Sequence, residues 1–415
     1  MSHILIACHA WYGDVIGGSF RLASEFAEDL AASGHAVDYL CCMPPGDGRY
    51  LQREEHRGVL VHRYPPPPPT TSRWGRMRWH VRESARLVRE IANEHTVDAL
   101  SGHSPLQFLG AASGSLKSGA FRSYVVHSPF DDELATQSAT RSQSIFASLA
   151  FRAARWVDRR CIRLADEVQT DSQYTLDVLR SRHRRALQSK GVVAPGWVDA
   201  GTFTPVFDRR ELRSQLGPEW TADGPVFFTL RRLEPRMGLD TLVAAAVRLR
   251  KSGEKFRVLI GGSGSLREEL ESQVAEHGLG DAVRFLGRIP EADLPRCYAA
   301  ADCFVLPTRS LECFGLIVLE AFAAGTPVIA SDAAAIPELA AIQGREWLFP
   351  AGDAAALADR MQDFLAGRLP LDVNVRSFAE RYDRPLITAH WESLLSMDAC
   401  CERTPPTAVA GSGSA

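Results

Sequence analysis

The chain has 415 residues, of which 45% are hydrophobic and 23% charged, and its formal net charge is −3 at pH 7. This composition is typical of a globular protein and excludes the disordered, collagen-like and disulfide-scaffold classes. The near-neutral charge argues against a nucleic-acid-binding protein, which would need a concentrated basic surface. A chain of this length predicts two domains.

Short apolar runs rich in β-branched residues alternate with helical patterns along the first half of the chain. Residues 4–8 read as a buried strand, followed by a loop that contains Gly17 and Gly18 and by a helix at 19–32. Such alternation predicts βαβ units and a parallel sheet. Further strands are predicted at 36–41, 59–62, 97–100, 123–127 and 167–170.

A second series of the same kind starts near Pro225. Its strands are predicted at 226–230, 257–260, 283–286, 303–306 and 328–330, and its helices at 239–249, 266–277 and 316–324. Two such series predict an α/β protein with two Rossmann-like, doubly wound parallel-sheet domains facing an interdomain cleft.

The Pro- and Gly-containing stretch between the two series marks the best domain boundary in the sequence. We therefore expect an N-terminal domain at 1–196 and a C-terminal domain at 197–384. A helix at 385–402 is expected to pack back on the N-terminal domain. The low-complexity residues 403–415 are expected to be disordered.

Neither the cysteines nor the N-terminus indicates a metal site or an export signal. The nine cysteines include no C-x-x-C pair, so no metal is expected. The first residues run directly into an apolar strand without a basic segment or a cleavage site. The most apolar stretch, 314–330, carries Glu320 and Pro327 and is not a membrane span. These features predict a cytoplasmic protein.

The strongest chemical signal is the segment 312–320, which follows a predicted strand and opens an apolar helix. A helix start offers unpaired N–H groups to a phosphate, and Gly315 lets the backbone approach a ligand closely. Glu312 precedes the helix and Glu320 lies more than one turn inside it. Two carboxylates flanking an anion suit the hydroxyls of a sugar and a ribose. The alternative is that Glu320 is a buried helix residue paired with an arginine.

Glu312 and Glu320 reproduce the E-x7-E pattern of retaining nucleotide-sugar glycosyltransferases, and residues 312–331 closely resemble glycosyltransferase family 4. Residues 232–236 and 261–266 resemble the family's phosphate-binding segment and its second glycine-rich turn. The resemblance covers nearly the whole chain and implies the GT-B fold, with an acceptor-binding N-terminal domain and a nucleotide-sugar-binding C-terminal domain. It also implies retention of the anomeric configuration, with a nucleotide-sugar co-substrate and without a cofactor or metal.

The resemblance assigns roles to individual residues. Glu320 would accept hydrogen bonds from the ribose, and Glu312 would hold the transferred sugar and its phosphate. Arg232 would neutralise the diphosphate leaving group, and His127, at a strand end, would contact the sugar. The remaining residues implied in donor binding are Gly17, Gly18, Arg231, Arg236, Gly262, Phe314, Gly315 and Leu316.

One position departs from the family pattern. The family usually has a lysine five residues after the arginine at 232, and this chain has Met237. The missing cation is either supplied by Arg231 or Arg236, or the donor site is impaired. The second reading makes the chain a catalytically impaired, glycosyltransferase-like binding protein.

Two further readings remain open at this point. A sugar-nucleotide epimerase can share the fold, whereas a nicotinamide dehydrogenase is disfavoured because no G-x-G-x-x-G follows a strand. The basic, Trp-containing segment 73–89 is either a solvated helix face or a peripheral contact with a membrane. The sequence does not identify the acceptor, the donor base or the donor sugar.

Overall fold

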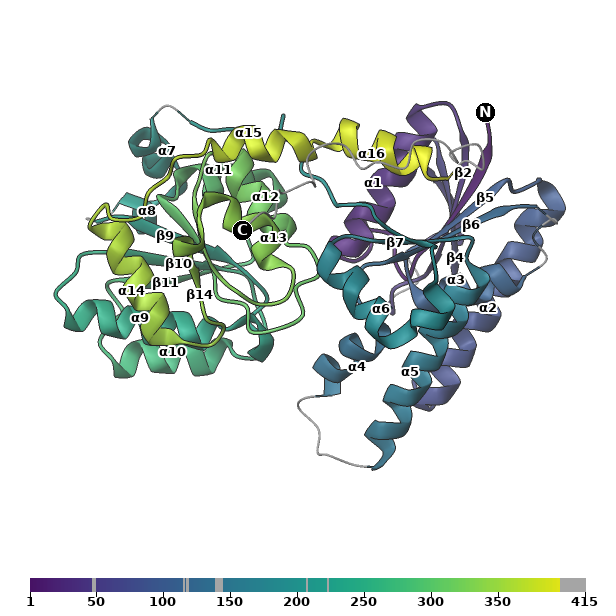
Figure 1. Cartoon of the computed structure of the whole chain (residues 1–415), viewed down its shortest axis with the longest axis horizontal. Coiled ribbons are helices and arrows are strands. Elements are labelled where there is room, and N and C mark those ends of the chain that lie inside the picture. Colours follow the sequence, from purple (N-terminus) through teal and green to yellow (C-terminus); the bar gives the residue numbers. More distant parts are fainter. Residues whose placement is uncertain are drawn as a thin grey trace. The chain divides into compact units, whose positions relative to one another are not determined.

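The computed structural model describes residues 1–46, 50–114, 116, 119–138, 145–206, 208–221 and 224–395. The chain forms two compact units (Figure 1). The first unit contains Met1–Pro195 and the chain from Ile387 onward, and the second unit contains Gly196–Leu386. The predicted tail at 403–415 and the end of the predicted C-terminal helix lie outside the described residues.

The first unit is built on a sheet that has eight strands within the described ranges, in the order β3-β4-β2-β1-β5-β6-β7-β8. Every neighbouring pair is parallel except β3 with β4. The strands are β1 His3–Ala7, β2 Ala36–Cys42, β3 Arg53–His56, β4 Val59–Tyr64, β5 Ala99–Gly102, β6 Phe121–Val126, β7 Glu167–Thr170 and β8 Gly191–Val193.

Helices cover both faces of this sheet. One face packs against α2, α3, α5 and α6, whose apolar side chains form a single buried cluster with those of the strands. On α1 and α16, Phe26 and Trp391 are in edge-on contact. The helices are α1 Gly18–Ala32, α2 Arg73–Glu94, α3 Pro105–Ser113, α4 Phe130–Ser138, α5 Ile145–Leu164, α6 Gln173–Leu187 and α16 Arg384–Ser393.

The second unit has a parallel sheet with the order β11-β10-β9-β12-β13-β14 in its described part. Its strands are β9 Val226–Leu230, β10 Arg257–Gly261, β11 Val283–Gly287, β12 Cys303–Leu306, β13 Val328–Ser331 and β14 Leu348–Phe349. Its helices are α7 Arg209–Leu216, α8 Pro218–Thr221, α9 Leu239–Lys251, α10 Arg267–Glu276, α11 Leu294–Ala300, α12 Leu316–Ala323, α13 Ile336–Ala340, α14 Ala354–Leu365 and α15 Val375–Ala379. Helices α9, α10 and α14 pack their apolar residues against one face of this sheet.

The prediction of two parallel-sheet α/β domains is confirmed. Strands β7, β9 and β12 have the predicted bounds. Three strands were not predicted, namely β3, β8 and β14. Two of them have two or three residues, too short for a periodic signal, and β3 is the charged sequence Arg-Glu-Glu-His.

The chain returns to the first unit at its C-terminal end. Trp391 on α16 is fully buried, and its indole Nε1 donates to the carbonyl of Pro195 at 2.9 Å. On the same helix, Glu392 lies 3.0 Å from the Nε2 of His35. These contacts tie α16 to the first unit. Across the described ranges, no helix has a stretch long and apolar enough to cross a membrane.

Candidate active site

Three neighbouring strand ends of the second unit gather most of the predicted donor-binding residues. The loops that follow β9 and β10 are joined by backbone hydrogen bonds, from Arg231 to Gly261 at 3.0 Å and from Leu233 to Ser263 at 3.0 Å. Strand β12 pairs with the other side of β9. Parallel strands end at the same edge of a sheet, so their loops share one surface.

Gly262 lies where these loops approach most closely. Its φ is +115°, a conformation that side-chain-bearing residues rarely adopt, and a Cβ there would be 1.9 Å from the carbonyl oxygen of Arg231. This glycine is therefore required for packing the two loops together, whatever its role toward a ligand.

Arginines from the β9–α9 loop reach the loop that follows β12. The Nη2 of Arg231 is 2.6 Å from the Oε2 of Glu312 and donates to the Oγ1 of Thr308 at 2.8 Å. Arg236 donates from Nη1 to the carbonyl of Leu311 at 2.8 Å. These contacts place Arg231, Arg236 and Glu312 in one cluster.

The three arginines of this loop also influence one another electrostatically. Burial lowers the pKa of Arg236, and the nearby cations Arg232 and Arg231 lower that pKa further. Arg232 itself is exposed. Mutual repulsion among three guanidinium groups makes this surface favourable for a multivalent anion.

The position of the missing lysine is buried. Met237 is 4% exposed and ends a short 3₁₀ helix, Pro235–Met237. A methionine fits this apolar environment. The side chain at 237 therefore packs inside the unit, whereas Arg231 and Arg236 contact Glu312 and Leu311 of the β12–α12 loop.

Helix α12 presents its N-terminus beside these arginines. Gly315 precedes it with a φ of +102°, and the first N–H groups of a helix have no partner within it. The ring of Phe314 is buried, 6.1 Å from the ring of Tyr382, so only the backbone of Phe314 is left for a ligand. Leu316 is the first residue of the helix.

Glu320 is held inside the same helix by a residue that sequence reasoning missed. It is 5% exposed, and its Oε2 accepts a hydrogen bond from the hydroxyl of Tyr298 at 2.8 Å. Tyr298 is fully buried against aromatic rings, including Phe228 at 5.5 Å and Phe304 at 5.2 Å. No sequence motif singles out Tyr298, because it lies in an ordinary apolar helix.

His127 lies in the first unit and takes part in a chain of hydrogen bonds across three strand ends. Its Nδ1 is 2.9 Å from the Oδ2 of Asp171, and its Nε2 is 3.0 Å from the Nδ1 of His103. The Nε2 of His103 is 3.1 Å from the Oγ of Ser101. Both ring nitrogens of His127 thus have partners within the first unit.

The carboxylate of Asp171 sets the direction of these hydrogen bonds. Asp171 accepts from the Nδ1–H of His127, so with neutral rings the Nε2 of His127 accepts from His103. Burial lowers the pKa of His103 well below its usual value, and neighbouring His127 lowers it further. The ring of Trp391 stacks on both imidazoles, at 5.8 and 6.4 Å.

The glycines predicted to bind donor or acceptor in the first unit flank the start of α1. Gly17 is the N-cap of this helix with an extended backbone, and Gly18 is its first residue. A Cβ on Gly17 would lie 2.9 Å from the ring of Phe20. Among the described side chains, no group of three or more His, Cys, Asp or Glu residues is arranged to hold a metal ion.

Comparisons with known proteins agree with this architecture. Residues 16–201 match the family described as Glycosyltransferase Family 4, and residues 209–381 match the one described as Glycosyl transferases group 1. The chain belongs to glycosyltransferase family 4. The family predicted from the sequence is thereby confirmed.

The relatives of this family 4 chain include enzymes that act on inositol-containing molecules. It is 32% identical over 216 residues to the phosphatidyl-myo-inositol mannosyltransferase of Mycobacterium leprae, covering 51% of this chain and 55% of the relative. It is 36% identical over 218 residues to the D-inositol 3-phosphate glycosyltransferase of Frankia alni, covering 50% and 47%. The chain therefore matches about half the length of these relatives.

Solved structures show the GT-B fold over 94–96% of this family 4 chain. Sucrose-phosphate synthase from Thermosynechococcus elongatus has a TM-score of 0.77 at 24% identity, covering 94% of this chain and 98% of that one. Anabaena HepE, solved in complex with UDP and glucose, has a TM-score of 0.71 at 21% identity, covering 96% and 100%. The predicted fold is confirmed.

Proposed function

We propose that this chain is a retaining glycosyltransferase that moves a hexose from a nucleotide-diphosphate sugar to a hydroxyl acceptor. The observation that carries the proposal is the cluster of Arg231, Arg232 and Arg236 beside Glu312 and the N-terminus of α12. Cations at a helix N-terminus suit a diphosphate. The UDP bound to HepE supports the same donor class.

The reaction needs no nucleophile from the protein. The bond between the anomeric carbon and the phosphate oxygen breaks, and the acceptor oxygen bonds to the same face of that carbon. Because the acceptor oxygen bonds to the face from which the phosphate leaves, the anomeric configuration is retained, and the acceptor proton passes to the departing phosphate oxygen. Arg232, exposed beside Arg231 and Arg236, stabilises the negative charge that grows on the diphosphate. The same cations neutralise the diphosphate without a metal.

The two glutamates have separate tasks in this proposal. Glu320, held by Tyr298, accepts hydrogen bonds from the ribose hydroxyls. Glu312, held by Arg231, accepts from the hydroxyls of the transferred sugar. Backbone N–H groups of Phe314, Gly315 and Leu316 contact the phosphate. His127 is proposed to contact the transferred sugar by exchanging one of its ring contacts, with Asp171 or with His103, for one with the ligand.

The first test is titration of UDP, GDP and dTDP by calorimetry, followed by hydrolysis assays with the corresponding sugars. At least one nucleotide is expected to bind, and Glu320→Ala should abolish this binding. Glu276→Ala, at an exposed position of α10, is the control and should bind normally. Failure of all nucleotides to bind would overturn the proposal. Formation of an epimer without any acceptor would identify an epimerase instead.

The missing lysine has its own test. If Arg236 supplies the second cation, Arg236→Ala lowers donor affinity about tenfold or more, since a charge-assisted contact is lost. Met237→Lys then changes donor affinity little. If Met237→Lys creates activity that the natural chain lacks, the natural chain is an impaired, glycosyltransferase-like binding protein.

The first unit is proposed to bind the acceptor and to contact a membrane surface peripherally. Helix α2 carries Trp74 at 48% exposure, close to exposed Arg73 and Arg78, a pattern that favours an anionic surface. Sedimentation with vesicles rich in anionic lipid should carry the wild type down, and Trp74→Ala with Arg78→Glu should remain in solution. Equal sedimentation of both proteins contradicts membrane contact.

A further inference from the structure

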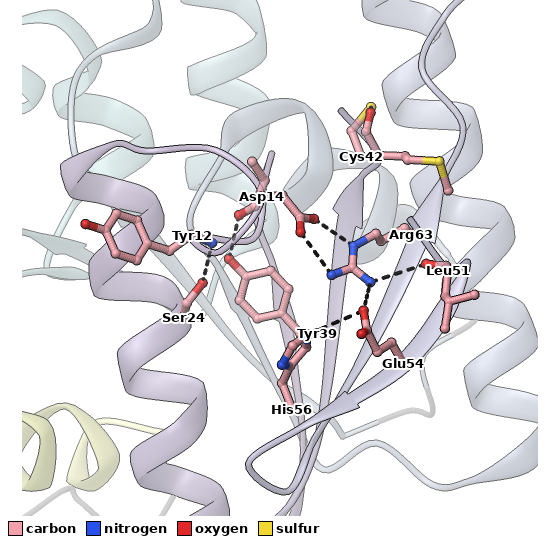
Figure 2. Close-up of polar contacts among 11 residues, drawn as sticks. Tyr12, Asp14, Ser24, Tyr39, Cys42, Leu51, Glu54, His56 and Arg63 are labelled. Atoms are coloured by element: carbon pink, nitrogen blue, oxygen red, sulfur yellow. Dashed lines mark hydrogen bonds and ion pairs between the residues drawn. The ribbon is translucent and has the colours of Figure 1, made fainter. Parts of the chain in front are cut away.

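Arg63 on β4 is a buried arginine whose contacts join three separate segments of the first unit. It is 2% exposed. Its Nε and Nη2 bind the two carboxylate oxygens of Asp14 at 2.7 and 3.1 Å, which is a bidentate pair. Its Nη1 donates to the Oε2 of Glu54 at 2.9 Å and to the carbonyl of Leu51 at 3.2 Å. Figure 2 shows the guanidinium between Asp14 and Glu54.

A buried ion pair of this kind contributes little net free energy to folding. Removing the Arg63 guanidinium and the Asp14 carboxylate from water costs free energy that their attraction only partly offsets, and an apolar replacement is often as stable. The side chains of Arg63 and Asp14 are only 1% and 6% exposed. Such an ion pair instead fixes the positions of the segments that it joins relative to one another.

The segment defined by Asp14 is the loop between β1 and α1, residues 8–17. The hydroxyl of Tyr39 also donates to the carbonyl oxygen of Ala10. The backbone N–H of Tyr12 donates to the Oγ of Ser24 (Figure 2), and the backbone N–H of His9 donates to the Oγ of Ser104. In that loop Trp11 also stacks on His56 of β3, with the ring centroids 5.6 Å apart and the planes 22° apart. The tip of the loop stays accessible, since Ile16 is 57% exposed.

The loop ends at Gly17 and is followed by Gly18, the first residue of α1, at the carboxyl edge of the sheet. Ligands of doubly wound sheets bind at this edge, so the loop's conformation decides whether a ligand finds its backbone in place. The β3–β4 hairpin contributes Glu54, His56 and Arg63. It therefore supports the loop from the side with both an ion pair and a ring contact.

We propose that Arg63 and Asp14 form a clamp that fixes the β1–α1 loop for ligand binding, which makes Arg63 a positioning residue of the first unit. The clamp depends on the proposed glycosyltransferase function only for the identity of the ligand. The clamp, Arg63 with Asp14, acts through the loop and touches no reacting atom. A ligand that binds only the fixed loop loses apparent affinity in proportion to the fraction of molecules in which the loop is displaced.

The test compares two carboxylates that bind the same arginine. Asp14→Asn removes the charge on the loop, whereas Glu54→Gln removes the charge on β3 and leaves the bidentate pair with Asp14 intact. Both variants leave Arg63 with one carboxylate fewer, so both should lower stability. Only Asp14→Asn should increase hydrogen exchange of residues 8–17.

Enzyme kinetics compare the same two variants, Asp14→Asn and Glu54→Gln. With the donor identified by the titrations above, Asp14→Asn should raise KM for donor or acceptor about tenfold with a smaller change in kcat. Arg63→Lys keeps the charge but cannot form two parallel bonds, so it should resemble Asp14→Asn. Equal loop exchange and equal KM in Asp14→Asn and Glu54→Gln would overturn the clamp and leave Arg63 a purely structural residue.

The two proposals fail in distinguishable ways. If the wild type binds no nucleotide and transfers no sugar, the proposed function fails, yet the exchange experiment still reports on the clamp. If the wild type is active and Asp14→Asn behaves as Glu54→Gln does, the clamp fails and the function stands. Hydrogen exchange is measured on the full chain without ligand, so it tests the clamp even if no donor is found.

Discussion

Replacing Tyr298 with phenylalanine isolates the hydrogen bond that holds Glu320. The ring and its contacts with Phe228 and Phe304 remain, and only the hydroxyl that donates to Glu320 at 2.8 Å is removed. Glu320 is 5% exposed, so water replaces the lost donor poorly. A hydrogen bond to a charged group contributes about 1.5–3 kcal/mol, and this is the expected loss in unfolding free energy of the second unit.

The same change should weaken nucleotide binding if Glu320 accepts from the ribose. Loss of this donor weakens the hold on the orientation of the carboxylate, and we expect Kd to rise about tenfold, which corresponds to about 1.4 kcal/mol. Calorimetric titration measures Kd directly and does not depend on two-state unfolding of a two-domain chain. Denaturant unfolding measures the stability change in parallel.

Tyr124→Phe is the matched control in the first unit. Tyr124 donates from its hydroxyl to the Oδ1 of Asp158 at 3.0 Å, and both residues are buried. This variant should lose stability and bind nucleotide as the wild type does. If Tyr298→Phe also binds nucleotide normally while Glu320→Ala does not, Tyr298 does not position Glu320. If both bind normally, Glu320 has only a structural role.

Three further predictions concern stability. Gly262→Ala should cost about 2 kcal/mol or more because of its φ and its 1.9 Å approach to a carbonyl, whereas Gly253→Ala, with a φ of +78° and open space around it, should cost about 1 kcal/mol in denaturant unfolding. Burial raises the pKa of Asp158 to about 7, so the folded state holds its proton more tightly. Stability should therefore fall as pH rises from about 4 to 7, and Asp158→Asn should remove this fall in pH-dependent unfolding. Trp391→Ala should destabilise the first unit by about 3–5 kcal/mol, measured by denaturant unfolding, and a loss below 1 kcal/mol would contradict the role of α16.

Much of the fold was predictable because its strands are buried and separated by amphipathic helices. Periodicity identifies such strands, and β7, β9 and β12 were predicted with their observed bounds. The antiparallel strand β3 was not predictable in this way. Its charged residues carry no apolar alternation, and tertiary contacts with β4 fix it instead.

The candidate site also contains some residues that the sequence could identify and others that only the fold brings together. Glu312, Glu320 and Gly315 stand in a spaced motif, so they could be proposed from the sequence. Tyr298 has no motif, because its importance comes from packing between elements distant in the chain. Asp171 was missed for the same reason, since it meets His127 only when neighbouring strands align. The predicted interdomain cleft and the residue roles stay predictions.

The path of the chain has a consequence for synthesis. The second unit is completed at Leu386, before the first unit receives Trp391. At roughly 5–20 residues per second, the residues between Pro195 and Trp391 take about 10–40 s to translate. During that interval the first sheet leaves the ribosome without α16 covering His103, His127 and Phe26. A nascent chain paused before residue 391 therefore exposes these rings to chaperones and proteases.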